Sequence, residues 1–62
     1  MGKSLFIHNM EYAVMQRKSA KLAKCPEVHD AHMQKAHQFE GYSADIKGWA
    51  AVEKYLARHL KE

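Results

Sequence analysis

The 62-residue sequence predicts a small all-α domain with three helices, near residues 9–24, 26–40 and 44–61. Three observations support this fold class. Apolar residues recur at helical spacing in each segment. The only proline, Pro26, lies between the first two segments, where it suits the first turn of a helix. Gly41 follows the second segment, where helices commonly end. We expect a three-helix bundle or a helical hairpin with an N-terminal arm. A second copy of the chain is one way to complete so small a core.

The first helix is expected to begin at Ser4 or Asn9, which are rival N-caps, and to end before Cys25-Pro26. One side is expected to face the core, and it carries Leu5, Tyr12, Met15, Ser19, Leu22 and Ala23, with His8 if the helix starts early. The other side begins with the apolar residues Phe6, Ile7, Met10 and Val14. Because one small core cannot easily bury both sides, these four residues are a candidate contact surface for another protein or a second copy. The alternative is that residues 1–8 fold back on the core.

The apolar side of the second helix is expected to consist of Val28, His32, Ala36 and Phe39. His29 and Met33 are expected to lie beside this side. Gly41 is its expected stop, and Tyr42-Ser43 is the expected turn into the last helix. Ser43 is the expected N-cap of that helix, and Gly48 is expected to mark a kink or a short turn ahead of its main part.

The last helix has the strongest amphipathic pattern. Its expected core stripe contains Ile46, Trp49, Val52, Leu56, Ala57 and Leu60. Glu53 lies within this stripe, and a buried carboxylate needs a partner. We therefore expect Glu53 either to pair with a Lys or Arg of another helix at the edge of the stripe, or to lie at a protein–protein interface.

The net charge of +3 is mildly basic and leaves nucleic acid open as a ligand. Two groups of basic residues are candidates for that contact: Arg17, Lys18, Lys21 and Lys24, and Lys47, Lys54, Arg58 and Lys61. A helix-turn-helix around Gly-Tyr-Ser would place Lys47, Ala51, Lys54 and Arg58 in the major groove. That surface lacks the Asn, Gln and Ser residues that commonly read bases, so phosphate-backbone contact is the better form of this alternative.

Catalysis is not expected, because a helical domain of this length offers no deep cleft and the sequence has no Gly-rich phosphate loop or paired-carboxylate motif. No cofactor is expected either. Cys25, His29 and His32 have the chemistry of metal ligands. However, Pro26 keeps Cys25 out of the second helix and a fourth ligand is not evident, so we predict no metal site.

The sequence indicates a cytoplasmic protein that is complete as given, because it begins with Met and has no signal peptide, membrane-spanning run or disulfide framework. The expected function is that of a small non-enzymatic regulatory or accessory protein, an inhibitor or adaptor, which binds another protein or a second copy of itself. Its candidate anchors are Phe6, Ile7, Met10, Val14, Trp49 and Tyr55. The alternative is a small basic nucleic-acid-binding protein.

Overall fold

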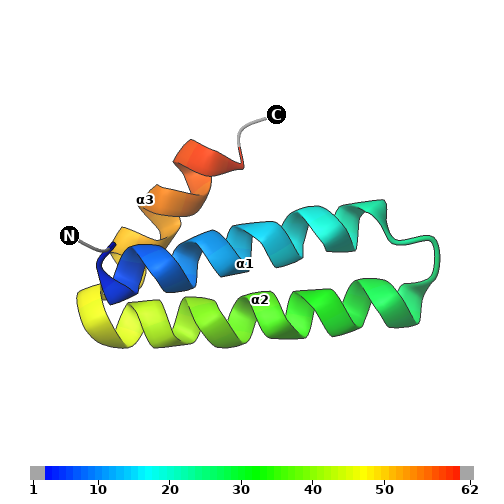
Figure 1. Cartoon of the computed structure of the whole chain (residues 1–62), viewed down its shortest axis with the longest axis horizontal. Helices are drawn as coiled ribbons and strands as arrows, with labels where there is room; N and C mark the ends of the chain where they lie inside the picture. The colour runs from blue at the N-terminus through cyan, green and yellow to red at the C-terminus, as the bar shows by residue number, and fades with distance from the viewer. Residues whose placement is uncertain (1–2, 61–62) are drawn as a thin grey trace.

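The computed structural model describes residues 3–60, which form three helices and no strand (Figure 1). Helices α1 (Leu5–Leu22) and α2 (Pro26–Lys47) lie antiparallel as a long hairpin. The shorter helix α3 (Trp49–His59) packs across one end of this hairpin. The molecule is elongated, with extents of 36 × 24 × 22 Å. The predicted all-α, three-helix fold is therefore confirmed. Between residues 3 and 60, each helix falls short of the combination of length and hydropathy that a bilayer crossing requires.

Helix α1 begins at Leu5, earlier than the predicted start near residue 9, because Ser4 is the residue that caps it. The backbone N–H of Ile7 donates to Ser4 Oγ at 3.2 Å, which satisfies one of the unpaired donors of the first turn. The rival cap, Asn9, is buried inside the helix. At the other end the helix stops at Leu22, two residues before the predicted end, and the chain is extended again at Cys25 before Pro26.

The two sides of α1 are exchanged relative to the prediction. Phe6, Met10 and Val14 face the interior together with Asn9, Ala13 and Ala20, so their assignment to an outer contact surface is wrong. The side expected to form the core points outward, with Leu5, Met15 and Leu22 at 65%, 59% and 81% exposure. The inward side carries small residues, Ala13 and Ala20, and the buried residues of α2 include Ala36 and Ser43. Small side chains on both helices allow their backbones to approach closely, which explains the choice of side.

Helix α2 continues without a break through Gly41, Tyr42 and Ser43, so the predicted stop and turn at residues 41–43 are wrong. Ser43 does not cap α3; it is fully buried and its hydroxyl donates to the carbonyl oxygen of Phe6 at 3.3 Å. The chain turns instead at Gly48, whose φ of 91° is a conformation that side chains disfavour. A helix-turn-helix with its turn at residues 41–43 is therefore absent from the described chain.

The hydrophobic core lies where α3 packs on the hairpin. Its buried members are Phe6, Met10 and Val52, and the partly buried side chains against them are Ile7, Ala44, Ala51, Tyr55 and Leu56. The predicted stripe of the last helix is thus correct at Val52 and Leu56. It is wrong at Trp49 and Ala57, which are exposed, and at Ile46, which is exposed on α2. Glu53 is also exposed, so it is not the buried carboxylate of this protein.

The buried carboxylate is Glu40, which forms an ion pair with Arg17 between α1 and α2. Glu40 is only 2% exposed, and Arg17 donates to it from both Nε and Nη2, the latter at 3.0 Å to Oε1. His37 Nδ1 lies 3.2 Å from the same Oε1 atom. The hydrogen bonds that Arg17 donates to Glu40 raise the pKa of Arg17 above its usual value. This pair joins α1 to α2 inside the hairpin.

Candidate protein-docking surface

Large hydrophobic side chains are exposed mainly on the hairpin. Of the seven that are exposed between residues 3 and 60, six belong to α1 and α2: Leu5, Met15, Leu22, Val28, Tyr42 and Ile46. The seventh is Trp49, the first residue of α3. Scattered apolar residues are normal on a protein surface, whereas a contiguous group marks an interaction site. The arrangement of these six side chains is therefore informative.

On α1 the exposed large hydrophobic residues Leu5, Met15 and Leu22 belong to a heptad row. The row, which we call the α1 row, consists of Leu5, His8, Tyr12, Met15, Ser19 and Leu22, with alternating steps of three and four residues. This alternation keeps side chains on one narrow stripe along a helix, and it is typical of helices that pack against another helix over their full length. The sequence pattern of this stripe was recognisable, but its assignment to the monomer core is wrong.

On α2 a second row repeats the pattern. This α2 row consists of Val28, His32, Lys35, Phe39, Tyr42 and Ile46, again with alternating steps of four and three residues. Its last two members were not recognisable as part of it, because Tyr42 was expected in a turn and Ile46 in a separate helix. The continuity of α2 through Gly41 is what aligns them with Phe39.

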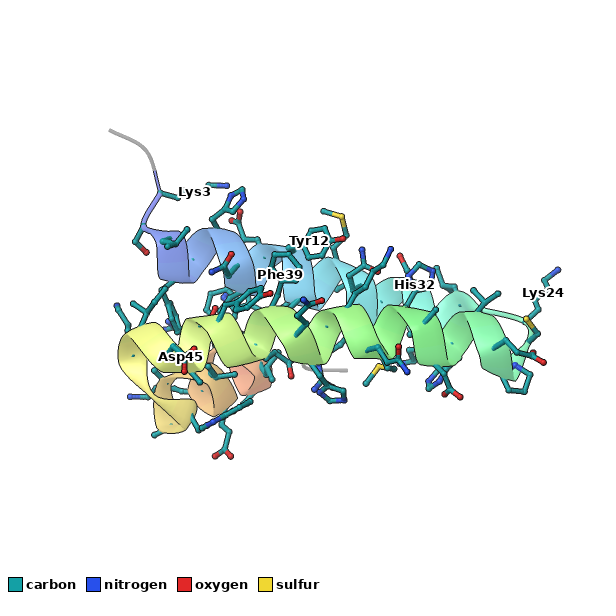
Figure 2. All side chains as sticks on the ribbon, turned by 90° about the horizontal axis from the view of Figure 1, so that it is seen from below. Lys3, Tyr12, Lys24, His32, Phe39 and Asp45 are labelled. Carbon is teal, nitrogen blue, oxygen red and sulfur yellow. The ribbon has the colours of Figure 1, made fainter. Side chains whose placement is uncertain are left out.

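The two rows adjoin and form one surface, which we call the apolar face. The ring of Phe39 lies 4.3 Å from that of Tyr12 and 5.3 Å from that of Tyr42, measured between centroids. Further along, His32 Nδ1 and Gln16 Oε1 are 2.6 Å apart and link the two helices beside the rows. In Figure 2, Tyr12, Phe39 and His32 lie on the upper side of the hairpin and α3 lies on the lower side. The apolar face is therefore turned away from α3 and has no cover within the described chain.

The predicted protein-binding anchors are divided by the structure. Phe6, Met10 and Val14 are core residues and Ile7 is half-buried beside them. Tyr55 is half-buried: its ring meets Phe6 edge-on at 6.1 Å and stacks on His59 at 4.0 Å. Burial raises the pKa of the Tyr55 phenol. Trp49, at 55% exposure, is the one predicted anchor that is freely accessible.

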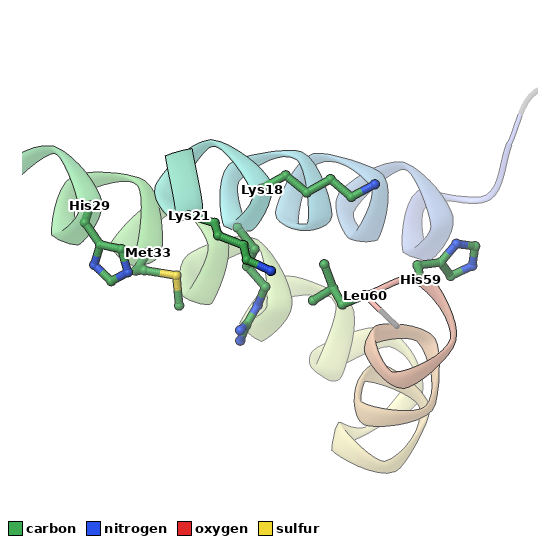
Figure 3. A pocket seen from close by; sticks show the side chains of 7 residues that line it. Lys18, Lys21, His29, Met33, His59 and Leu60 are labelled. Atoms are coloured by element: carbon green, nitrogen blue, oxygen red, sulfur yellow. The ribbon is translucent and has the colours of Figure 1, made fainter. Parts of the chain in front are cut away.

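Six of the eight predicted basic residues line two hollows bordered by α3. One hollow of about 350 Å³ is lined by Arg17, Lys18, Lys21, His29, Met33, His59 and Leu60 (Figure 3). A second hollow, of about 240 Å³, is lined by Phe6, Ile7, Lys47, Ala51, Lys54, Tyr55 and Arg58. Both are bordered by residues of α3, so the fold brings residues from each of the two basic groups close to this helix.

Not every basic residue is equally available for binding. Arg17 is committed to Glu40, and Lys47 places its Nζ 5.0 Å above the ring of Phe6, a cation–π distance. Lys24 is exposed beyond the end of α1 and lines neither hollow. Lys61 lies outside the described residues. Lys18, Lys54 and Arg58 are exposed.

The three residues with metal-ligand chemistry, Cys25, His29 and His32, each have different surroundings. Cys25 is exposed at the turn before α2. His29 Nδ1 lies 3.3 Å from Asp30, and His32 bonds to Gln16. Within residues 3–60, no three His, Cys, Asp or Glu side chains are grouped closely enough to hold a metal ion.

Comparisons with protein-family models, with curated proteins and with solved structures found no match for this chain. The functional argument therefore depends on the geometry of the apolar face and of the basic residues around α3.

Proposed function

We propose that this chain is a small non-enzymatic regulatory or accessory protein that acts by binding another protein through its apolar face. The observation that carries the proposal is the gathering of six of the seven exposed large hydrophobic side chains on two adjoining heptad rows. Covering a fully exposed aliphatic side chain contributes about 1.5–3 kcal/mol, so several such side chains together favour a stable contact. An inhibitor or adaptor is the class of protein that needs a binding surface and no catalytic cleft.

The spacing of the rows specifies the shape of the partner. Heptad rows accept knobs from a facing helix, so the complementary surface is one or more amphipathic helices aligned with the hairpin. The aromatic group formed by Tyr12, Phe39 and Tyr42 lies near the middle of the face, where binding energy is commonly concentrated.

Site-specific photo-crosslinking in cells tests this proposal. A photoreactive amino acid in place of Met15 or Tyr42 should give protein adducts of defined mass, because both positions lie on the apolar face. The matched control is the same amino acid in place of Ala57, which is exposed on α3. Adducts from Ala57 alone, or none from either position of the face, would refute the proposed role of this surface.

A second candidate function is nucleic-acid binding, and a specific observation favours it. Basic residues that are distant in sequence, among them Lys18, Lys54 and Arg58, line two hollows bordered by α3. Contact with the phosphate backbone is the form of binding that such a surface supports, since α2 contains no recognition turn.

The nucleic-acid candidate is tested by fluorescence anisotropy with duplex DNA and single-stranded RNA at about 50 and 200 mM salt, because release of counterions makes backbone binding salt-dependent. Lys54→Glu should weaken binding and flatten its salt dependence. Lys24→Glu makes the same change of charge at an exposed position that lines neither hollow, and it should leave binding as it is. Equal effects of the two variants, or no binding at the lower salt, would remove this function from consideration.

The reducing cytoplasm is the location that we propose for this activity. Cys25 is a free thiol on the surface of the protein, and exposed thiols persist where cellular reductants keep them reduced.

A further inference from the structure

We infer that a second copy of the chain covers the apolar face, so that two hairpins form a four-helix bundle. The inference rests on the proposed protein-binding role of this face and specifies its occupant. Its starting point is the contradiction in α1: the side with the spacing of a core faces outward in the single chain.

Both hairpin helices carry the heptad pattern, which a single partner helix would not require. One docking helix needs a groove between α1 and α2, whereas two full-length rows side by side suit a facing pair of helices. A second hairpin supplies such a pair. Two hairpins stacked face to face can be related by a two-fold axis parallel to the helices or by one perpendicular to them in the plane of the interface. Either axis makes each helix antiparallel to the helix it meets, as in up-and-down four-helix bundles.

The rows are matched end to end along the hairpin. The contacts of Tyr12 with Phe39 and of Ser43 with Phe6 fix the register of α1 against α2. In that register the middle of the α1 row, between Tyr12 and Met15, lies beside the middle of the α2 row. Both rows contain six positions. Consider a two-fold axis that passes through the middle of both rows, lies in the plane of the apolar face and runs perpendicular to the helices. This axis places each row against the same row of the second copy, in reverse order.

Reversal of the α1 row brings like with like. Leu5 meets Leu22 of the second copy, Tyr12 meets Met15, and His8 meets Ser19. The first two pairs are apolar, and the third joins two side chains that can hydrogen-bond. An isologous interface requires this kind of self-complementarity.

Reversal of the α2 row gives a second matched set. Val28 meets Ile46 of the second copy, and His32 meets the hydroxyl-bearing ring of Tyr42. Lys35 meets Phe39, over whose ring an ammonium group is attracted, and it does not meet Lys35 of the other copy. The one cation in the two rows is thus placed without a like-charge contact.

The size of the face is adequate for a dimer. The 18 residues of α1 span about 27 Å at about 1.5 Å per residue. Two helices about 10 Å apart then present roughly 500 Å² in projection. The accessible area of a ridged helical surface exceeds its projection and reaches the order of the about 800 Å² per partner that stable complexes bury.

The test is a charge swap read by sedimentation. One variant carries Leu5→Glu and Leu22→Glu, and the other carries Leu5→Lys and Leu22→Lys. Both positions are exposed in the single chain, so each variant should keep its helix content. The unmodified chain should sediment at twice its 7.2 kDa, each variant at the mass of one chain, and their equimolar mixture again at twice that mass.

A control with Gln34→Glu and Ala57→Glu, which changes exposed positions outside the rows, should remain dimeric. Three results would overturn the inference: a single-chain mass for the unmodified protein up to about 1 mM, where even contacts worth about 4 kcal/mol are populated; unchanged dimers of both variants; or no dimer in their mixture. The mass of the unmodified protein is measured without the variants, so the first of these tests holds even if the variants do not fold.

Failure of the inference is distinguishable from failure of the proposed function. A monomer whose Met15 crosslinks to a different protein retains the docking role and loses the second copy as occupant. A monomer that gives no adducts from the apolar face loses both.

Discussion

At the scale of single residues, Glu40 is the buried charged side chain of the described hairpin. It is buried between two long helices, where Arg17 of α1 forms an ion pair with it and His37 Nδ1 of its own helix lies within hydrogen-bonding distance. Removing one partner of a buried ion pair leaves an uncompensated charge, whereas replacing both with apolar groups can be neutral. The two partners are unequal, since the Arg17 side chain is 26% exposed and can reach water.

This asymmetry predicts an order of stabilities. Arg17→Met should lower the free energy of unfolding by about 3 kcal/mol, because Glu40 stays buried with His37 alone. Glu40→Gln should cost less, about 1–2 kcal/mol. The double variant Arg17→Met with Glu40→Leu should be more stable than Arg17→Met. Urea denaturation measures this order, because the midpoints rank the variants by stability when the dependence of the unfolding free energy on urea is the same for all of them. If Glu40→Gln proved the more damaging single change, the account of Arg17 would be wrong.

The phenol of Tyr55 predicts a response to alkaline pH. Burial raises its pKa in the folded chain, and the nearby Glu11 carboxylate adds to that effect. A group with a raised folded pKa contributes stability below its unfolded value of about 10, and that contribution is lost as pH rises through the folded pKa. Tyr55 should ionise above its ordinary pH range in a titration of absorbance near 295 nm. Tyr55→Phe should abolish this late phase and Tyr42→Phe should retain it; the reverse pattern would contradict the assignment.

At the scale of elements, the two glycines of the second half act in opposite ways. Gly41 lies inside α2, and a methyl group added there would meet no atom within 4 Å. Gly48 has similar space but a φ of 91°, which other residues adopt only with strain.

Alanine at each position is therefore expected to change stability with opposite sign. Gly41→Ala should raise the free energy of unfolding by about 0.5–1 kcal/mol, because alanine favours the helix. Gly48→Ala should lower it by about 1–3 kcal/mol. Thermal melts followed by circular dichroism at 222 nm compare the two. Stabilisation by Gly48→Ala would mean that the junction between α2 and α3 is placed wrongly.

The elements also show what sequence patterns predict and what they leave open. Helical periodicity and Pro26 predict three helices and the first junction correctly. The stop at Gly41 is wrong because a glycine inside a helix costs only about 1 kcal/mol. Contacts of Glu40 and Ser43 with α1 outweigh that cost.

The candidate site was only partly predictable for the same reason. Both sides of α1 are apolar, so the choice between Met10 and Met15 as the buried residue depends on the surface of α2, which local periodicity does not contain. Three members of the α2 row, Val28, His32 and Phe39, were on the predicted apolar side of this helix. That side also held Ala36, which is buried, and the end of the row became visible only with the uninterrupted helix. Contacts between residues distant in sequence decide which side of a helix is buried when both sides are apolar.

At the scale of the whole molecule, a dimer joined through the apolar face should have a melting temperature that depends on concentration. For a chain of this length, each tenfold increase in concentration should raise the midpoint by about 4–6 °C over the range where the dimer predominates. Differential scanning calorimetry measures this shift. The Leu5→Lys, Leu22→Lys variant is the control and should melt at one temperature throughout. A concentration-independent midpoint for the unmodified chain would contradict self-association.

The placement of α3 on the side opposite the apolar face has a consequence for valency. Two chains joined face to face would carry their α3 helices on the two outer surfaces of the bundle, about two hairpin layers apart. Each outer surface would present the hollows that Lys18, Lys54 and Arg58 line. Any acidic ligand of these hollows would then be bound twice by one rigid particle. Such a particle can crosslink separate ligands or hold two sites of one ligand with avidity, which a single copy cannot do.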